Sequence, residues 1–310
     1  MRGLDRIKGL VLEKARLRRS IVSCQRRNAI YPHTLLTGIG GTGKTYLAIA
    51  IAEELGYYIF VVEGAAIKTR DILISILQNA QREARSNDQV LLFFIDEIHR
   101  LSSVLQEALY YPLVENYITT ATGDIHFDPF TMIGATTQPQ ALDKGSFITR
   151  CRRIDIGRYA EMDIGNILRE TFDEMGIEHK YNPELIRLIA QRSLGLPRRC
   201  RELAAIIRDQ IYYRGGDIKL TKTDLNEVFR LEKLDSIGLD EKHQLYLMAL
   251  LKANGPMGIK SLSGRLGLSE SEVEEMIEPI LLSLGFVVNR PRGRILTSAG
   301  YQHLAEEGKV

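Results

Sequence analysis

The chain has 310 residues, which is enough for two or three domains that each bury a core of their own. Apolar residues make up 45% of it and charged residues 26%, as in soluble globular proteins, which argues against disorder, collagen-like repeats and disulfide scaffolds. Lys and Arg number 41 against 39 Asp and Glu, so the formal net charge of +2 gives no protein-wide basic signature of nucleic-acid binding. Any DNA-binding surface must therefore be local.

Cysteine usage and hydropathy favour a cytoplasmic protein. Cys24, Cys151 and Cys200 lie far apart without C-x-x-C spacing, which argues against a disulfide framework or a zinc site. The longest apolar stretches are much shorter than the roughly 18 residues that a membrane span needs. The first residues carry charges where a signal peptide has its apolar region. We therefore expect a cytoplasmic localisation and no membrane partner.

The segment from about residue 34 to 157 alternates short apolar runs with amphipathic stretches. This alternation predicts an α/β domain in which crossover helices connect the strands of a parallel sheet. The runs expected to form strands are residues 34–37, 58–62, 90–95, 130–135 and 154–156.

Strand-like runs are missing from about residue 160 to 232, and helical periodicity replaces them. A third segment follows residues 237–240 and has the element order of a winged helix. We predict three domains, residues 1–158, 159–235 and 236–310. The expected helices are residues 183–193, 198–213 and 223–231 in the second domain and 241–253, 259–266 and 270–283 in the third, followed by a hairpin of residues 286–288 and 294–296.

The strongest chemical signal is the phosphate-binding motif G-x-x-x-x-G-K-[ST], which residues 38–45 satisfy between a predicted strand and a predicted helix. Its glycines allow backbone N–H groups to surround phosphates, and the helix amino terminus adds a partial positive charge. Lys44 is expected to reach the outer phosphates and Thr45 to hold magnesium. The residues assigned to the nucleotide are Gly38, Gly40, Gly41, Thr42, Gly43, Lys44, Thr45 and Tyr46.

Asp96 and Glu97 directly follow the apolar run of residues 90–95. A buried parallel strand would bring both carboxylates to the edge of the sheet where the phosphate loop lies. Asp96 then suits magnesium, and Glu97 suits activation of a water molecule. Such a pair also occurs at ordinary helix starts, but the upstream phosphate loop favours the catalytic interpretation. His99 is expected to orient its neighbours or pack, and not to act as the base.

Residues 96–101, 111–116 and 129–137 together resemble the RuvB family, Holliday-junction branch-migration motors of the AAA+ class. Residues 195–198 are similar to that family's sensor 2 segment, and residues 238–240 and 290–294 are similar to parts of its third domain. The similarity covers nearly the whole chain in the expected order. It implies an AAA+ P-loop core, a small helical lid and a carboxyl-terminal winged helix.

The resemblance also implies roles for individual residues. Lys44, Thr45 and Asp96 would bind the magnesium nucleotide, with ATP and Mg²⁺ as the cofactors, and Glu97 would polarise the attacking water. Thr137 would be the sensor 1 group and Arg198 the sensor 2 group. Tyr159 would pack on the adenine, although a core tyrosine is an equally good interpretation.

An arginine finger is implied at Arg150, within residues 145–151, where it would reach the nucleotide of a neighbouring subunit. Such an arginine offsets charge that develops in the transition state. Arg152 and Arg153 lie close enough in sequence to be alternatives, and all three are also compatible with ordinary surface charges.

The predicted wing packs Arg290, Arg292 and Arg294 into six residues around a Pro and a Gly, which suits contact with DNA phosphates. Winged helices also bind proteins, so a protein-binding or solvated hairpin remains an alternative.

Residues 117–128 are shorter than the family's hairpin that engages RuvA, which leaves the use of a RuvA-like partner open. The amino-terminal stretch is basic too; a solvated helix face is its simplest interpretation, and a position at the subunit interface of a ring is the alternative. Its cations are Arg2, Arg6, Lys8, Lys14, Arg16, Arg18, Arg19, Arg26 and Arg27.

The combined sequence evidence favours an ATP hydrolase and DNA helicase that drives Holliday-junction branch migration in DNA recombination and repair. It would assemble as a ring, by resemblance a homo-hexamer, on four-way junction or duplex DNA. One alternative is a loader that uses ATP to place another protein on DNA. Another is a scaffold in which ATP controls protein assembly.

Overall fold

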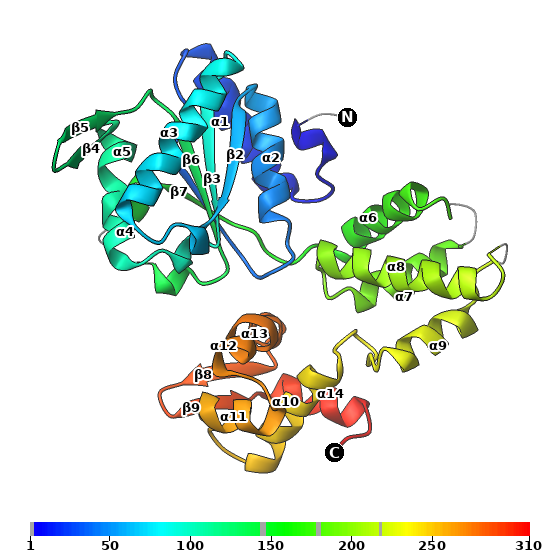
Figure 1. Cartoon of the computed structure of the whole chain (residues 1–310). Coiled ribbons are helices and arrows are strands. Elements are labelled where there is room, and N and C mark those ends of the chain that lie inside the picture. The colour runs from blue at the N-terminus through cyan, green and yellow to red at the C-terminus, as the bar shows by residue number, and fades with distance from the viewer. Residues whose placement is uncertain (1–2, 143–146, 178–180, 217–218) are drawn as a thin grey trace. The chain divides into compact units, whose positions relative to one another are not determined.

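The computed structural model describes residues 3–142, 147–177, 181–216 and 219–310 (Figure 1). Contacts divide the chain into two compact units. The first comprises Met1–Gly38 and Thr42–Gly157, and the second comprises Ile39–Gly41 and Arg158–Val310. Among the helices of the described ranges, none has both the length and the apolar character that crossing a membrane requires.

The first unit is built on a parallel sheet of five strands in the order β2-β3-β6-β1-β7 (Figure 1). β1, the first five residues of β3 and all of β6 are buried, because helices cover both faces of the sheet. The predicted parallel α/β domain is therefore confirmed. The strands are β1 (Thr34–Thr37), β2 (Tyr58–Glu63), β3 (Leu91–Asp96), β6 (Thr131–Thr136) and β7 (Arg152–Asp155).

The last strand begins two residues earlier than the sequence predicts, at Arg152. The backbone N–H of Arg152 donates to the carbonyl of His33 over 2.8 Å, and Arg152 is the register partner of Thr34. Pairing with β1 therefore extends the strand through two arginines that hydropathy alone does not identify as strand residues.

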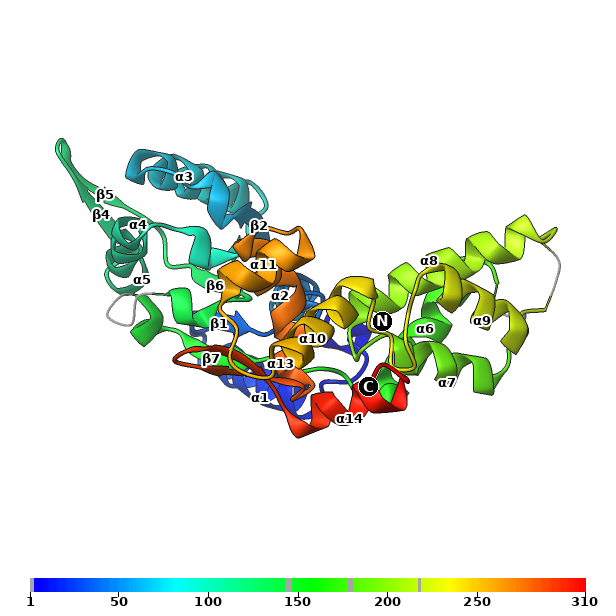
Figure 2. The ribbon, with the colours of Figure 1, turned by 90° about the horizontal axis from the view of Figure 1, so that it is seen from below.

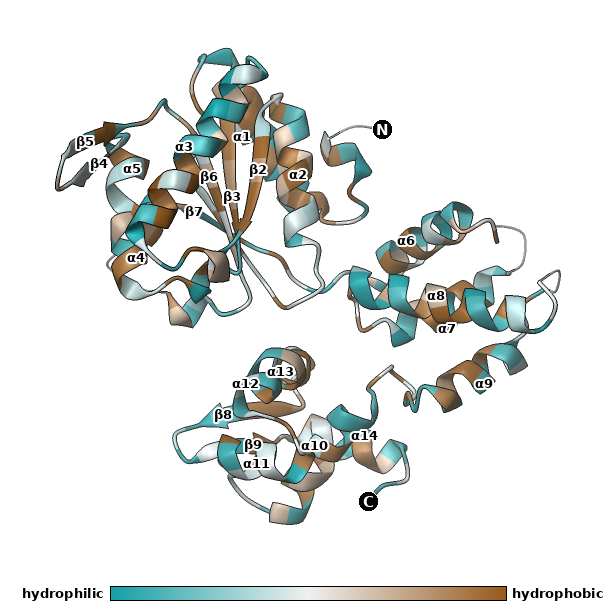
Figure 3. Cartoon of the chain, in the orientation of Figure 1, coloured by the Kyte–Doolittle hydropathy of each residue, from teal (hydrophilic) through white to brown (hydrophobic). Residues whose placement is uncertain are grey.

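Helices α1 (Val11–Arg26) and α3 (Arg70–Ser86) lie on opposite sides of this sheet (Figure 2). The buried face of α3, with Leu73 and Leu77, belongs to the same core as Phe93 and Ile95 of β3. Figure 3 shows apolar residues concentrated in β2 and β3. The other elements of this unit are η1 (Gly3–Arg6), α2 (Lys44–Leu55), η2 (Gly64–Ala66), η3 (Ile98–Arg100), α4 (Ser103–Ala108), α5 (Tyr110–Val114), β4 (Tyr117–Thr120), β5 (Gly123–His126), η4 (Pro139–Ala141) and η5 (Phe147–Arg150).

The second unit starts with four helices that share one apolar core. The side chain of Asn182 accepts a hydrogen bond from the N–H of Leu185 and caps α7, while Thr221 and Asp224 form a capping box on α9. The three helices predicted here are confirmed, and α6 is an additional one. The four are α6 (Glu161–Glu174), α7 (Pro183–Arg192), α8 (Pro197–Tyr213) and α9 (Lys222–Leu231).

The remaining elements form a winged helix, as predicted. The expected helix over residues 270–283 contains one π-helical segment, because Pro279 has no N–H to donate to the preceding turn. A last helix follows the hairpin and was not predicted. The elements are α10 (Glu241–Ala253), α11 (Ile259–Leu266), α12 (Glu270–Glu272), the π segment Val273–Ile277, α13 (Glu278–Ser283), β8 (Val287–Arg290), β9 (Gly293–Leu296) and α14 (Ser298–Glu306).

Candidate nucleotide site and charged surfaces

The phosphate-binding motif forms the loop between β1 and α2. Gly41 and Gly43 have φ angles of 82° and 87°, in the left-handed region that favours glycine. A Cβ at Gly38 would lie 2.3 Å from the carbonyl oxygen of Ile156, so only glycine fits there. The N-cap residue of α2 is Gly43, which has no side chain to cap the helix. Its first N–H groups and the positive end of its dipole are therefore suited to bind phosphate.

Lys44 and Thr45 form the first turn of α2 beneath this loop. The Lys44 Nζ donates to the carbonyl of Gly38 over 2.9 Å, and the residue is only 7% exposed. The Thr45 hydroxyl donates to Oδ2 of Asp96 over 2.8 Å. Asp96 ends β3, so the parallel sheet brings the two motifs together as the sequence predicts. The Thr45 and Asp96 oxygens are of the hard type that Mg²⁺ prefers.

Glu97 follows β3 in the left-handed conformation, with a φ of 45°. Its Oε2 accepts hydrogen bonds from the backbone N–H of Thr137 over 3.3 Å and from the Thr137 hydroxyl over 3.1 Å. The Nδ1 of His99 lies 3.1 Å from the same oxygen. The structure thus brings the expected water-activating and sensor 1 residues into direct contact.

The environment of Glu97 favours its ionised form. Burial acts to raise the pKa of its carboxyl, but hydrogen bonds from His99 and Thr137, together with the charges of His99 and Lys44, lower that pKa to about 2. The His99 side chain is 7% exposed, and its Nδ1 also lies 3.0 Å from the hydroxyl of Thr136. His99 therefore contacts the carboxylate and the end of β6 at once, in agreement with its expected orienting role.

The three arginines considered for a finger differ in their contacts. Arg150 is exposed, donates from Nη2 to the hydroxyl of Tyr110 and lies 5.1 Å from the centroid of that ring. Arg152 donates to the hydroxyl of Ser20 over 2.7 Å, and Arg153 pairs with Asp155 over 2.7 Å. Tyr110 carries no carboxylate, so this contact leaves the charge of Arg150 uncompensated. The first two residues of its motif, 145 and 146, lie outside the described residues.

Arg198 and Tyr159 belong to the second unit. Arg198 is exposed in the first turn of α8, and its backbone N–H donates over 3.2 Å to the carbonyl of Gly41, a phosphate-loop residue of the same unit. Tyr159 packs against the core of the four helices, as the core interpretation expected. In the first unit, the ring of Tyr46 lies under the guanidinium of Arg6 at 5.1 Å.

The wing separates its three arginines. Arg290 and Arg292 are exposed, whereas the Arg294 side chain is only 16% exposed. The Arg294 Nε donates to Oε1 of Glu278 over 2.7 Å, and its Nη2 donates to Glu274 over 2.9 Å. Glu278 also accepts a hydrogen bond from Tyr246 over 2.8 Å, so Arg294 belongs to a buried polar network. The structure does not present Arg294 with the other two as a DNA contact.

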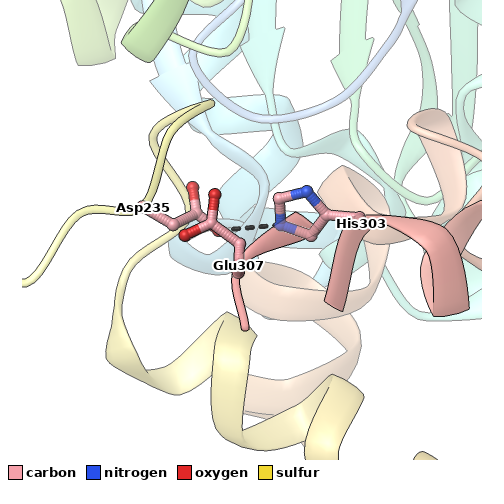
Figure 4. Close-up of side chains that lie close together, drawn as sticks. All are labelled: Asp235, His303 and Glu307. Carbon is pink, nitrogen blue, oxygen red and sulfur yellow. Dashed lines mark hydrogen bonds and ion pairs between the residues drawn. The ribbon is translucent and has the colours of Figure 1, made fainter. Parts of the chain in front are cut away.

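A second polar cluster escaped sequence analysis, because its members are far apart in the chain. His303 Nε2 lies 2.9 Å from Oδ2 of Asp235, and Glu307 approaches the same point (Figure 4). The ligand atoms of the three residues lie within 4.8 Å of one another. The other oxygen of Asp235 accepts backbone N–H groups from residues 237, 238 and 239, and Glu307 accepts the N–H of Ser236. These bonds fix the turn that leads into α10.

The sheet order, phosphate loop, acidic pair, helical lid and winged helix together define an AAA+ P-loop ATPase. Family models agree: residues 3–150 match the Holliday junction DNA helicase RuvB P-loop domain, and residues 236–305 match the RuvB C-terminal winged helix domain. The chain belongs to the RuvB family.

Similar proteins extend over almost the whole chain. It is 32% identical over 315 residues to the Holliday junction branch migration complex subunit RuvB of Ligilactobacillus salivarius, covering 97% of this chain and 89% of the relative. A mutant of Thermotoga maritima RuvB has a similar structure, with a TM-score of 0.87 at 29% identity over 98% of both chains. A structure described as the Thermotoga maritima RuvB Holliday junction branch migration motor gives a TM-score of 0.84 at 28% identity, covering 98% of this chain and 97% of that one.

Proposed function

We propose that this chain is an ATP-driven DNA motor that moves Holliday junctions during DNA recombination and repair in the cytoplasm. The observation that carries the proposal is the hydrogen bond of Thr137 to Glu97, next to the Thr45–Asp96 pair. The full-length similarity to proteins named as branch migration subunits supports the choice of DNA junctions as the substrate.

The nucleotide site is proposed to hold ATP through the N–H groups of the phosphate loop, with Lys44 leaving Gly38 to contact the outer phosphates. Thr45 and Asp96 would hold Mg²⁺, which supplies neutralisation of phosphate charge when bound. Their direct hydrogen bond of 2.8 Å places two suitable oxygens at one point, so the residues fit this ion.

Glu97 is proposed to orient and polarise the attacking water. A carboxylate with a pKa of about 2 is a weak general base near neutral pH, so its main contribution is to position the water and stabilise developing positive charge on it. Thr137 and His99 hold the carboxylate in place by hydrogen bonds to the same oxygen. Loss of either contact should therefore disturb hydrolysis without preventing ATP binding.

We further propose that catalysis is shared between subunits of a ring, in which Arg150 reaches the nucleotide of the neighbouring subunit. Arg150 precedes the last strand, whereas Arg152 and Arg153 are strand residues of β7 held by Ser20 and Asp155, which supports this assignment over those two. Arg198 would sense the nucleotide from α8, and the ring would be a homo-hexamer. Tyr159, by its packing, would act through the lid core.

Arg290 and Arg292 are proposed to contact DNA phosphates from the tip of the wing. Arg294 would support them by holding β9 against Glu278. The hairpin of β4 and β5, with four residues in each strand, is the proposed docking element for a RuvA-like protein.

The proposal is tested by the ATPase rate of the purified chain with and without four-way junction DNA, alone and with a candidate RuvA. We expect junction DNA to raise the rate, and the partner to raise it further. An ATPase rate that no DNA structure changes, with or without the partner, would refute the motor and favour the ATP-controlled scaffold.

A further inference from the structure

Helix α1 has a buried side and a strongly basic exposed side. Leu17, Ile21 and Cys24 are at most 2% exposed and face the interior of the first unit. Arg16 and Arg19 are exposed on the other side, and Arg27 follows at the end of the helix. None of these three arginines belongs to the phosphate loop, the acidic pair or the wing.

The basic side borders three adjoining depressions of the surface. The first has a volume of about 610 Å³, and its lining includes Arg16, Arg19, Arg27 and Arg152. The second, of about 170 Å³, shares Arg16 and Arg152 with it, and the third, of about 550 Å³, shares Arg19 and Arg27. The shared arginines make the three depressions one continuous basic track. We call it the α1 track; its further cations are Arg18, Arg26 and Arg153.

Positive charge on the α1 track is poorly balanced. Two arginines of the track pair with carboxylates, Arg18 with Asp5 and Arg153 with Asp155, as surface arginines such as Arg85 and Arg201 do elsewhere. Within the described ranges, no carboxylate lies within ion-pair distance of Arg16, Arg19, Arg26 or Arg27. Glu13 and Asp155 line only the smallest depression, where Asp155 already pairs with Arg153. A surface of this kind attracts a polyanion.

We infer that the α1 track binds the phosphodiester backbone of DNA, as a second contact besides the wing; this inference rests on the proposed function. The row from Arg16 to Arg27 spans about 16 Å at a helical rise of about 1.5 Å per residue. Duplex DNA presents about one negative charge per 1.7 Å of its axis, so such a row faces several phosphates. Guanidinium groups and the exposed hydroxyl of Ser23 are suitable phosphate donors.

The chemistry of the track predicts binding without sequence preference. Its lining holds no aromatic side chain on which a base could stack and no Asn or Gln that could read a base edge. Arg152 donates to the buried Ser20, which fixes β7 against α1 and keeps the two basic walls together. We therefore place the contact of these guanidinium groups on the backbone phosphates.

The test compares two triple variants of the full chain that each lose three positive charges from the first unit. One is Arg16→Ala, Arg19→Ala and Arg27→Ala on the α1 track. The matched control is Arg70→Ala, Arg82→Ala and Arg85→Ala on α3, where the arginines are also exposed. Binding of a fluorescent duplex is measured by anisotropy over a salt series, with two unrelated DNA sequences, and the ATPase rate without DNA checks that each variant is intact.

We expect the α1 variant to bind at least tenfold more weakly at low salt. The slope of log affinity against log salt should decrease by roughly 2 to 3, because each lost phosphate contact is worth about 0.9. The α3 control should keep the wild-type slope, and both DNA sequences should behave alike. An unchanged slope in the α1 variant would overturn the inference.

Two further outcomes are decisive. Sedimentation velocity shows whether the α1 variant assembles like the wild type. If its assembly changes while the slope of log affinity against log salt does not, the track contacts a second copy of the chain. The inference would then be wrong. DNA affinity is measured without hydrolysis, so the two proposals fail separately. If the wild type moves no junction, but its salt slope exceeds that of the α1 variant as expected, the proposed motor function is wrong and the inference about the α1 track still holds.

Discussion

The nucleotide site and the wing both carry charged residues at strand ends, but the structure uses them differently. Around the phosphate loop, Asp96 and Glu97 meet Thr45 and Thr137, because parallel strands bring their carboxyl ends to one edge of the sheet. In the wing, Arg290 is exposed while Arg294 points into a network with Glu278. Sheet topology therefore places the charged side chains of the nucleotide site together, but it does not do so for the arginines of the wing.

The pairing of the wing strands explains this separation. Arg294 is the register partner of Asn289, and Arg290 is the partner of Gly293. Side chains of neighbouring residues alternate between the two faces of a strand, so Arg294 and Arg290 lie on opposite faces. A cluster of arginines in a hairpin is thus divided into an outward and an inward group, whereas the ends of parallel strands converge.

The largest effect should come from Arg150→Ala. We expect ATP turnover to fall by about 10³-fold or more, since an arginine supplied to a neighbouring site stabilises transition-state charge, while ATP binding is retained. Turnover is measured with saturating ATP and binding with a fluorescent nucleotide. Mixing this variant with Lys44→Ala should restore part of the rate, because one variant supplies the arginine and the other the intact site. Wild-type turnover by Arg150→Ala alone would contradict shared catalysis.

Arg294→Ala should destabilise the second unit by about 3 to 5 kcal/mol, because it leaves the buried Glu278 carboxylate without its partner. Urea unfolding measures the loss. Arg292→Ala is the matched control and should leave the unfolding midpoint unchanged, because its side chain is exposed. Equal unfolding midpoints for both variants would show that Arg294 stabilises the wing no more than the exposed Arg292 does.

His99→Ala should raise the pKa of Glu97, because burial would then act against fewer compensating hydrogen bonds and charges. The pKa of Glu97 is about 2 in the folded protein and about 4.3 in the unfolded chain. Its ionised carboxylate therefore stabilises the folded state fully above about pH 4.3, and this contribution is lost as the pH falls toward 2. The variant should shift the acid limb of the ATPase profile to higher pH. His126→Ala, an exposed histidine of the same unit, should keep the wild-type profile; identical profiles for both variants would disprove the role of His99.

Tyr110→Phe should have the smallest effect, a decrease in turnover of a few fold with unchanged ATP affinity. The substitution removes the hydrogen bond to Arg150 but keeps the ring on which the guanidinium lies. Tyr110→Ala should lower turnover further. Equal rates for wild type and both variants would show that Tyr110 does not position Arg150.

Much of the nucleotide site was predictable because its signals are local. The spacing of residues 38–45 and the position of Asp96 after an apolar run fix both motifs, and parallel topology brings them together. The pairing of Arg294 with Glu278 was not predictable, because it depends on how β9 packs against a helix 16 residues earlier. The same holds for Asp235 and His303, which are 68 residues apart. Such contacts arise only from tertiary packing.

The central claim, that ATP hydrolysis at this site moves DNA junctions, is tested most directly by comparing the wild type with Glu97→Gln in a four-way junction migration assay. Glutamine keeps the size of the side chain but removes the charge that polarises water. We expect the wild type to move junctions with ATP, and the variant to bind ATP and DNA without moving junctions. Equal junction movement by both proteins would contradict it.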